Sequence, residues 1–232
     1  MSGIPIPTIR QAPVALRIVT LVTLFLTIIP GAAYSEPADP QVISIAEARG
    51  LPLGTVVTID GSVTVPSGAF SSSTFDQGFA IQDHTGGIYV SVPVSQGFGL
   101  RQQVRVTGEL ADTVLPGLLV LINVTDIKAH GTGPKVQALP VATGAVGEAT
   151  EGKLVRIRAT ITQPILNDLP FGFQLFVNDG SGEVHVFVCA STGIDVSGLS
   201  EGQTIEVTGF SGQFAADYEV DPRTQDDIRI LP

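Results

Sequence analysis

The chain has 232 residues, 44% of them hydrophobic, with 12 Lys and Arg against 22 Asp and Glu. Its formal net charge of −10 at pH 7 disfavours general binding to nucleic-acid phosphates, which requires clustered positive charge. Cys189 is the only cysteine, so an intrachain disulfide is excluded. Stability must therefore come from apolar burial and backbone pairing.

Residues 1–35 have the composition of a secretory signal peptide. Arg10 and Arg17 precede an apolar run over residues 18–29, and small residues follow it up to Ser35. The run is shorter than the ~20 residues that a membrane-spanning helix needs, although an uncleaved N-terminal anchor stays open. We expect a periplasmic or secreted protein with a mature N-terminus close to Glu36 and no membrane span after cleavage. Because residues 1–35 hold two arginines and no acidic residue, the mature chain would carry a net charge of −12.

The rest of the chain contains an internal duplication. The stretch GFAIQDHTGGIYV (78–90) returns as FQLFVNDGSGEVHV (173–186). The paired landmarks occur in the same order: Gly54 and Gly152, Pro66 and Pro164, 83–86 and 179–182, 104–108 and 205–209, and 126–127 and 227–228. A repeat of this length fits a small domain that occurs twice. The predicted organisation is a signal peptide (1–35), a spacer (36–43), domain 1 (44–130), a linker (131–140) and domain 2 (141–232).

The first repeat predicts a short helix followed by five strands. Ser44 is a helix cap and Gly50 a stop, so the helix covers residues 44–49. The apolar runs then place strands at 56–65, 78–82, 87–92, 104–110 and 118–128. Gly61 predicts a bulge or a tight coil in the first strand. The second and third strands form a hairpin.

The second repeat predicts the same order of elements. It has a helix candidate at 143–149 and strands at 154–162, 173–178, 183–189, 204–210 and about 226–230. Five strands with a long, bent first strand and a hairpin describe an oligonucleotide/oligosaccharide-binding (OB) barrel. We therefore predict an all-β fold of two tandem five-stranded OB-like barrels. An immunoglobulin-like sandwich would need about seven strands and a core tryptophan, and the chain has no Trp.

The motifs of the first repeat resemble a family of secreted bacterial modules. They are Gly-x-x-Val-x-Ile-x-Gly-x-Val-Thr (54–64), Phe-x-Ile-Gln-Asp-x-Thr-Gly-Gly-Ile-Tyr-Val (79–90) and Val-x-Val-Thr-Gly (104–108). This pattern is similar to the tandem OB-like modules found in the extracytoplasmic sensor part of histidine kinases and beside extracellular nucleases. The resemblance implies a binding or sensing unit, with a sensor kinase or a nuclease as a possible partner protein. Because the second repeat runs to Pro232, we expect signalling to require a separate chain.

Catalytic and metal-binding patterns are scarce. His84, His130 and His185 do not have the spacing of a metal site, and we expect Cys189 to be an inert thiol. We therefore predict no catalytic residues, no metal and no cofactor. The acidic run at 217–221, followed by Asp226 and Asp227, is the better cation candidate, but a solvated loop between strands four and five is the favoured interpretation.

The two hairpin turns predict tight local structure. Asp83 and Asp179 each precede a glycine-containing turn, which is typical of an Asx turn rather than a calcium loop. Each third strand opens just after such a turn, so we expect positive φ at Gly87 and Gly182.

The outer face of strands two and three is the predicted ligand-binding surface, because OB barrels bind ligands there. Strict alternation points Phe79, Ile81, Ile88, Val90, Leu175, Val177, Val184, Val186 and Val188 inward. It points the candidate ligand-binding residues outward: Gln82, Tyr89, Gln174, Phe176, His185 and Phe187. Aromatic rings beside amides suit stacking on a flat ring or a sugar. Phe176 and Phe187 have the alternative of burial between the two barrels.

Three functions fit this sequence. The favoured one is a non-catalytic, exported tandem OB-fold module that binds or senses a small ligand or a partner protein. A nucleic-acid-binding protein associated with an extracellular nuclease is the alternative. It would need a basic stripe, which only Lys153, Arg156, Arg158, Arg101 and Arg105 approach. A structural scaffold module is the third.

Overall fold

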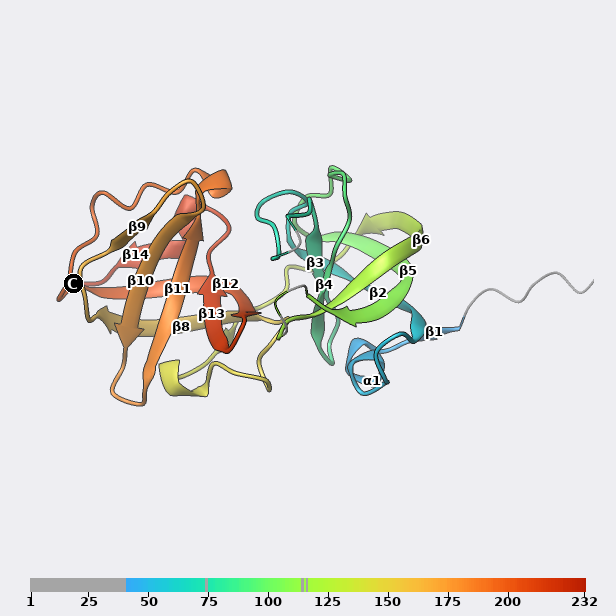
Figure 1. Ribbon diagram of the computed structural model, residues 1–232, viewed down its shortest axis with the longest axis horizontal. Helices are drawn as coiled ribbons and strands as arrows, with labels where there is room; N and C mark the ends of the chain where they lie inside the picture. The colour runs from blue at the N-terminus through green and yellow to red at the C-terminus, as the bar shows by residue number, and fades with distance from the viewer. Residues whose placement is uncertain (1–40, 74, 114, 116) are drawn as a thin grey trace, which may run out of the picture. The chain divides into compact units, whose positions relative to one another are not determined.

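Five strands close the first barrel of the computed structural model, which describes residues 41–73, 75–113, 115 and 117–232 (Figure 1). The predicted signal peptide lies outside the described residues, as does most of the spacer. The strands are β2 (Val56–Val65), β3 (Phe79–Gln82), β4 (Gly87–Val90), β5 (Gln102–Asp112) and β6 (Leu119–Thr132). Their pairings run β2–β3–β4–β6–β5 and return to β2, and only β4–β6 is parallel. This closed order is that of an OB barrel, which confirms the predicted fold class.

The first strand, β2, is long because it serves both sides of the barrel. Residues Val56–Ser62 pair with β5, whereas Ser62–Val65 pair with β3. Gly61 lies just before this change of partner, where an added Cβ would approach the backbone of Gln82 to 3.1 Å. The irregularity in the pairing lies between Val63 and Val65, so the predicted bulge is displaced from Gly61.

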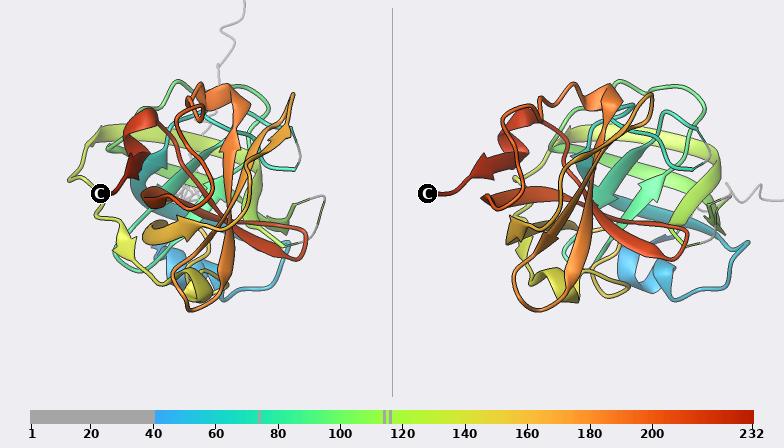
Figure 2. Two further views of the ribbon diagram at one scale, coloured as in Figure 1. Left: turned by 90° about the vertical axis from the view of Figure 1, so that its left-hand side faces the viewer. Right: turned by 60° about the vertical axis from the view of Figure 1, so that its left-hand side comes forward.

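The second barrel repeats the closed order with β8 (Leu154–Ile161), β10 (Gly172–Asn178), β11 (Glu183–Cys189), β12 (Thr204–Phe214) and β13 (Asp217–Asp221) (Figure 2). Short strands extend the two sheets: β1 (Val42–Ile43), β7 (Leu139–Pro140), β9 (Leu166–Asp168) and β14 (Ile228–Ile230). Single 3₁₀ turns lie at η2 (Ala190–Thr192) and η3 (Gln225–Asp227). No helix among the described residues is both long and apolar enough to cross a membrane.

The fifth strand of the second barrel differs from the sequence prediction. The acidic run expected to be a loop is β13, which pairs with both β11 and β12 and closes the barrel. The predicted strand near the C-terminus survives only as β14, which pairs with β12 outside the closed ring. In the first repeat, the single continuous strand β6 forms the pairings that β13 and β14 divide between them in the second. In the second, Pro222 lacks an amide proton and the turn η3 follows it, so the strand is divided.

A carboxylate fastens the segment before each barrel to its hairpin turn. The predicted first helix is α1 (Ile45–Arg49), capped by Ser44. Asp83 accepts hydrogen bonds from the backbone N–H groups of Ile45, Thr85 and Gly86 at 2.7–2.9 Å. Burial raises the pKa of Asp83, but the hydrogen bonds from Thr85, Ile45 and Gly86 outweigh it, and the pKa is lowered.

The second repeat keeps this arrangement without a full helix. Asp179 accepts from the backbone N–H of Thr143 at 3.1 Å and of Ser181 at 2.9 Å. Both predicted Asx turns are therefore confirmed. The helix predicted at 143–149 is a single 3₁₀ turn, η1 (Thr143–Ala145), because the segment contains Gly144 and Gly147, which weaken a helix.

Each barrel encloses its own apolar core. All nine residues predicted to point inward are buried: those of the first repeat in one cluster and those of the second in another. A third cluster combines Ala80, Tyr89 and Phe210, and so joins residues of β3, β4 and β12. The described residues belong to one compact unit, Asp39–Pro232.

The two barrels are also joined by buried polar contacts. Glu151, whose side chain is almost fully buried, accepts from Arg49 Nη2 at 2.8 Å and from the backbone N–H of Leu119 at 3.2 Å. Burial raises the pKa of Glu151, and Arg49 opposes that shift without cancelling it. Gln82 Oε1 accepts from the backbone N–H of Leu154 at 2.8 Å.

Two glycines allow a close approach between the backbones of the two barrels. A Cβ added to Gly87 would collide with the carbonyl of Gly152, and one added to Gly152 would collide with the carbonyl of Gly87. Gly152 has φ +80°, but Gly87 has an ordinary φ, so the prediction of positive φ at Gly87 is wrong. It is confirmed at Gly182, where φ is +151°. Gly87 is constrained by its neighbour rather than by its own dihedral angle.

Gly87→Ala should therefore destabilise the protein by about 1–3 kcal/mol, because the methyl group must force two backbones apart. Gly87 is the cleaner test of the contact than Gly152, since its φ suits alanine. Gly99→Ala is the matched control: it is exposed, and an added Cβ meets no atom within 4 Å. Urea unfolding of both variants measures the difference, and equal stabilities would show that the barrels do not meet at this point.

Candidate ligand-binding site

A cavity of about 770 Å³ is lined by residues from both repeats. The second barrel contributes the outer face of β10, β11 and β13, together with residues of β12. The first barrel contributes residues from the loop between β2 and β3 and from the loop between β5 and β6. The strand-two and strand-three face and these two loops are the elements with which OB barrels bind ligands. We call this cavity the aromatic cleft.

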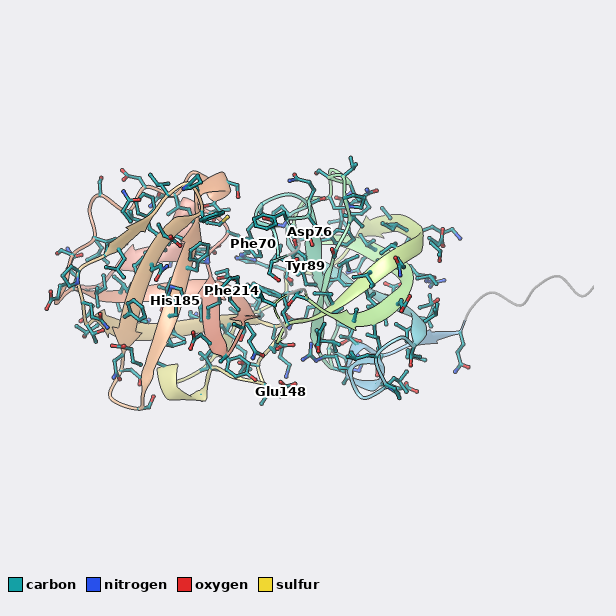
Figure 3. All side chains as sticks on the ribbon, viewed as in Figure 1. Phe70, Asp76, Tyr89, Glu148, His185 and Phe214 are labelled. Carbon is teal, nitrogen blue, oxygen red and sulfur yellow. The ribbon has the colours of Figure 1, made fainter. Side chains whose placement is uncertain are left out.

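Tyr89 forms the base of the cleft on the side of the first barrel. Its hydroxyl donates to Asp76 Oδ1 at 2.8 Å, and its ring lies parallel to that of Phe70 with 6.3 Å between centroids (Figure 3). Burial, with the neighbouring Asp76 carboxylate, raises the pKa of Tyr89. The ring is only 1% exposed because Phe70 and Phe210 cover it. Tyr89 therefore points away from the barrel core as predicted, but it is a buried part of the wall rather than a free stacking platform.

An aromatic row crosses the opposite wall. Phe176 and His185 are cross-strand partners on β10 and β11, with their rings stacked at 5.2 Å and 17°. Phe187 follows on β11, with its ring 5.9 Å from that of His185. The three side chains are half-buried. They are therefore neither fully exposed, as a free binding face would be, nor fully buried between the two barrels. His185 and Phe187 line the cleft with Gln174, whereas Phe176 supports His185 from behind.

Two carboxylates on β13 complete this wall. Glu219 lies opposite His185 in the parallel pairing of β11 and β13, with Oε2 3.4 Å from His185 Nδ1. Asp221, two residues further, shares this face and is 7% exposed. Asp221 Oδ1 and His185 Nε2 are both buried, and neither has a hydrogen-bond partner among the residues that the structure describes. Burial raises the pKa of Asp221 well above its ordinary value, and the nearby Glu219 and Cys189 add to the shift.

Exposed apolar side chains surround the opening. Phe75 is 77% exposed, Phe171 55% and Phe214 49%, and Leu115 is also exposed. All four are lining residues of the cleft. Large apolar groups gathered around a concave site mark a place of binding more often than of structure.

The charge of the lining restricts what can enter. Asp168, Glu219 and Asp221 are its acidic members, and within the described residues no Lys or Arg lines the cleft. A phosphate group would therefore find no cation to pair with in the cleft. Within the described part of the chain, no group of three or more His, Cys, Asp or Glu side chains is arranged to hold a metal ion.

The structure brings together four of the six predicted ligand-binding residues: Tyr89, Gln174, His185 and Phe187. Gln82 is instead occupied by its hydrogen bond to Leu154. Sequence reasoning missed Phe70, Phe75 and Phe214 because they lie in loops or near strand ends, where alternation gives no direction. It missed Glu219 and Asp221 because an acidic run was taken for a loop, although their i, i+2 spacing around the apolar Val220 indicates a strand face.

No protein-family model matches the chain, and no curated protein matches it in sequence. Among solved structures, the p204 HINb domain is 12% identical with a TM-score of 0.35, covering 77% of this chain and 96% of that one. Fission yeast Pot1 with ssDNA is 11% identical with a TM-score of 0.37, covering 85% and 90%. A murine DNA binding protein bound with ds DNA is 14% identical with a TM-score of 0.35, covering 70% and 90%. At these scores the similarities identify no ligand, and the fold assignment rests on the strand pairings.

Asp221→Asn should stabilise the protein at neutral pH. The folded state holds the Asp221 proton more tightly than the unfolded state does, so stability falls as pH rises from the ordinary carboxyl value of 3.8 towards the raised pKa. The loss approaches about 1.4 kcal/mol per pH unit within that window. Asparagine does not titrate, so the advantage of the variant should grow as the pH rises above the ordinary carboxyl value of 3.8.

Chemical denaturation of parent and variant at several pH values measures this difference. It separates Asp221 from Glu151, whose raised pKa affects both proteins alike. Asp226→Asn removes the same charge from an exposed position and is the control. A pH-independent difference for Asp221→Asn would contradict the assignment of a proton to this buried carboxyl group.

Proposed function

We propose that the chain is a non-catalytic, exported binding module whose small ligand occupies the aromatic cleft. The observation that carries the proposal is the convergence of OB ligand-binding elements from both repeats on one cavity lined by Phe70, Phe187 and Phe214. The volume of about 770 Å³ lies within the range of sites for small molecules. Export rests on the sequence of residues 1–35.

A partner protein is the second candidate occupant, because the exposed rim extends the apolar surface beyond the cavity itself. Phe75 in particular is more exposed than a ligand confined to the cleft would require. A sensor kinase or an extracellular nuclease is the kind of partner that the sequence resemblance implies. Aromatic side chains at an opening of this kind serve as anchors in protein interfaces.

A neutral apolar dye such as Nile red should bind the protein saturably at one site. Phe214→Ser should weaken this binding about tenfold, because the apolar contact of one ring is lost. Leu53→Ser is the matched control, since Leu53 is similarly exposed but does not line the cleft. Fluorescence titration gives both affinities. Absence of saturable binding, or an equal loss in the two variants, would exclude the cleft as a ligand site.

Single-stranded DNA should bind weakly or not at all at physiological salt. Beyond the negative net charge, three of the five candidate basic residues already lie against carboxylates: Arg105 beside Asp60 at 3.2 Å, and Arg156 and Arg158 beside Glu206 at 4.0 and 2.7 Å. Titration of a labelled oligonucleotide at near-physiological ionic strength tests this expectation. Submicromolar binding with a steep salt dependence, lost in Phe214→Ser but not in Leu53→Ser, would favour the nucleic-acid alternative.

A further inference from the structure

We propose that the aromatic cleft selects organic cations: ligands with an apolar or aromatic body and a protonated amine that donates hydrogen bonds to Asp221 and Glu219. This inference rests on the proposed function and names the chemical class of its ligand. It is carried by the geometry of the wall formed by β11 and β13.

Asp221 is a buried acid with an unsatisfied oxygen. It is more than nine-tenths buried and lines the cavity, and no described residue donates a hydrogen bond to its Oδ1. A buried acceptor without a partner costs free energy that a donor from the ligand would recover. Glu219, on the same face two residues away, has its Oε2 3.4 Å from His185 Nδ1. A ligand that supplies an N–H group would give Asp221 Oδ1 the donor that it lacks among the described residues.

The acidic residues of the cleft favour a positively charged ligand. Glu219 and Asp221 adjoin in the cleft, and no Lys or Arg occurs among its lining residues in the described part of the chain. A cationic ligand offsets the burial and the repulsion from Glu219 that keep Asp221 protonated in the free protein. A cation is attracted to this position and an anion is repelled. A bound ammonium group thus favours the ionised form of Asp221. The ionisable groups that act on Asp221 are Glu219 of its own strand and Cys189 of β11. The other neighbouring strand, β12, contributes Phe210 and Gly212 to the cleft, and neither residue is ionisable.

Aromatic side chains share the cavity with the two acidic residues. Phe187, Phe210 and Phe214 line the cavity together with these carboxylates. The faces of aromatic rings attract cations, and this attraction grows when water is excluded. Rings and carboxylates in one cavity thus recognise both ends of an arylalkylamine. A bare metal ion is a poor alternative, since the described residues offer no group of three ligands.

The test compares three probes that share a phenyl body: 2-phenylethylamine, 2-phenylethanol and 3-phenylpropanoate. Their affinities for the mature chain are measured at pH 7.5 by NMR titration of backbone amides. We expect the amine to bind at least about tenfold more tightly than the alcohol, as a hydrogen bond to a charged group implies. The carboxylate probe should bind more weakly than the alcohol, because it is repelled.

Asp221→Asn should reduce the preference for the amine over the alcohol to within about twofold, while the affinity for the alcohol stays unchanged. The variant is expected to fold, since an asparagine amide has nearly the shape of the protonated Asp221 carboxyl group and never carries a charge in the buried position. Glu219→Gln provides a second, independent reduction, and Asp226→Asn should keep the full preference. An amine that binds no better than the alcohol, or a preference that survives in Asp221→Asn, would overturn the inference.

The same measurements separate this inference from the proposed function. If Nile red and 2-phenylethanol bind in the cleft but the amine has no advantage, only the ligand class is wrong. If Nile red and all three probes fail to bind, the cleft is not a small-ligand site and both proposals fall.

Discussion

The close approach of the Gly87 and Gly152 backbones determines how the two barrels pack against each other. Only residues without a Cβ allow β4 and the start of the second barrel to approach so closely. Around this point Glu151 binds both Arg49 and the backbone of β6, and Gln82 binds the backbone of β8. A buried acid with one unsatisfied oxygen, Glu151 Oε2, contributes little net stability, but it penalises other arrangements of the two barrels. The contact thus fixes the walls of the aromatic cleft.

The two repeats share one fold but carry different side chains at equivalent positions of the face of strands two and three. The cross-strand pair Ala80 and Tyr89 in the first barrel corresponds to Phe176 and His185 in the second. The small Ala80 and the buried Tyr89 allow Phe210 of the other barrel to pack against them. Phe176 instead supports an imidazole that also contacts Phe187 and Glu219. One face therefore serves mainly for packing, and the other retains polar groups that a ligand can reach.

Sequence reasoning was strongest where local chemistry determines structure. The Ser44 cap, the Asp83 and Asp179 turns and the alternation of β3, β4, β10 and β11 all followed from patterns within a few residues. It failed at β13, because the charges of Asp217, Glu219 and Asp221 suggested solvent, whereas strand pairing placed two of them in a wall. It also gave Gly87 the wrong reason for being glycine, since the atom that excludes a side chain belongs to a residue 65 positions away. Contacts between repeats have no signature in one sequence.

The arrangement on β13 is costly for a purely structural wall. An apolar residue at position 221 would remove both the unpaired oxygen and the repulsion from Glu219. Such local costs tend to persist at sites where a partner supplies the missing interaction. The neighbouring polar groups show the contrast, because Asp76 receives the Tyr89 hydroxyl and Asp227 receives Arg223. Asp221 lines the cleft and has an oxygen without a hydrogen-bond partner among the described residues, and that interaction is one that a ligand can provide.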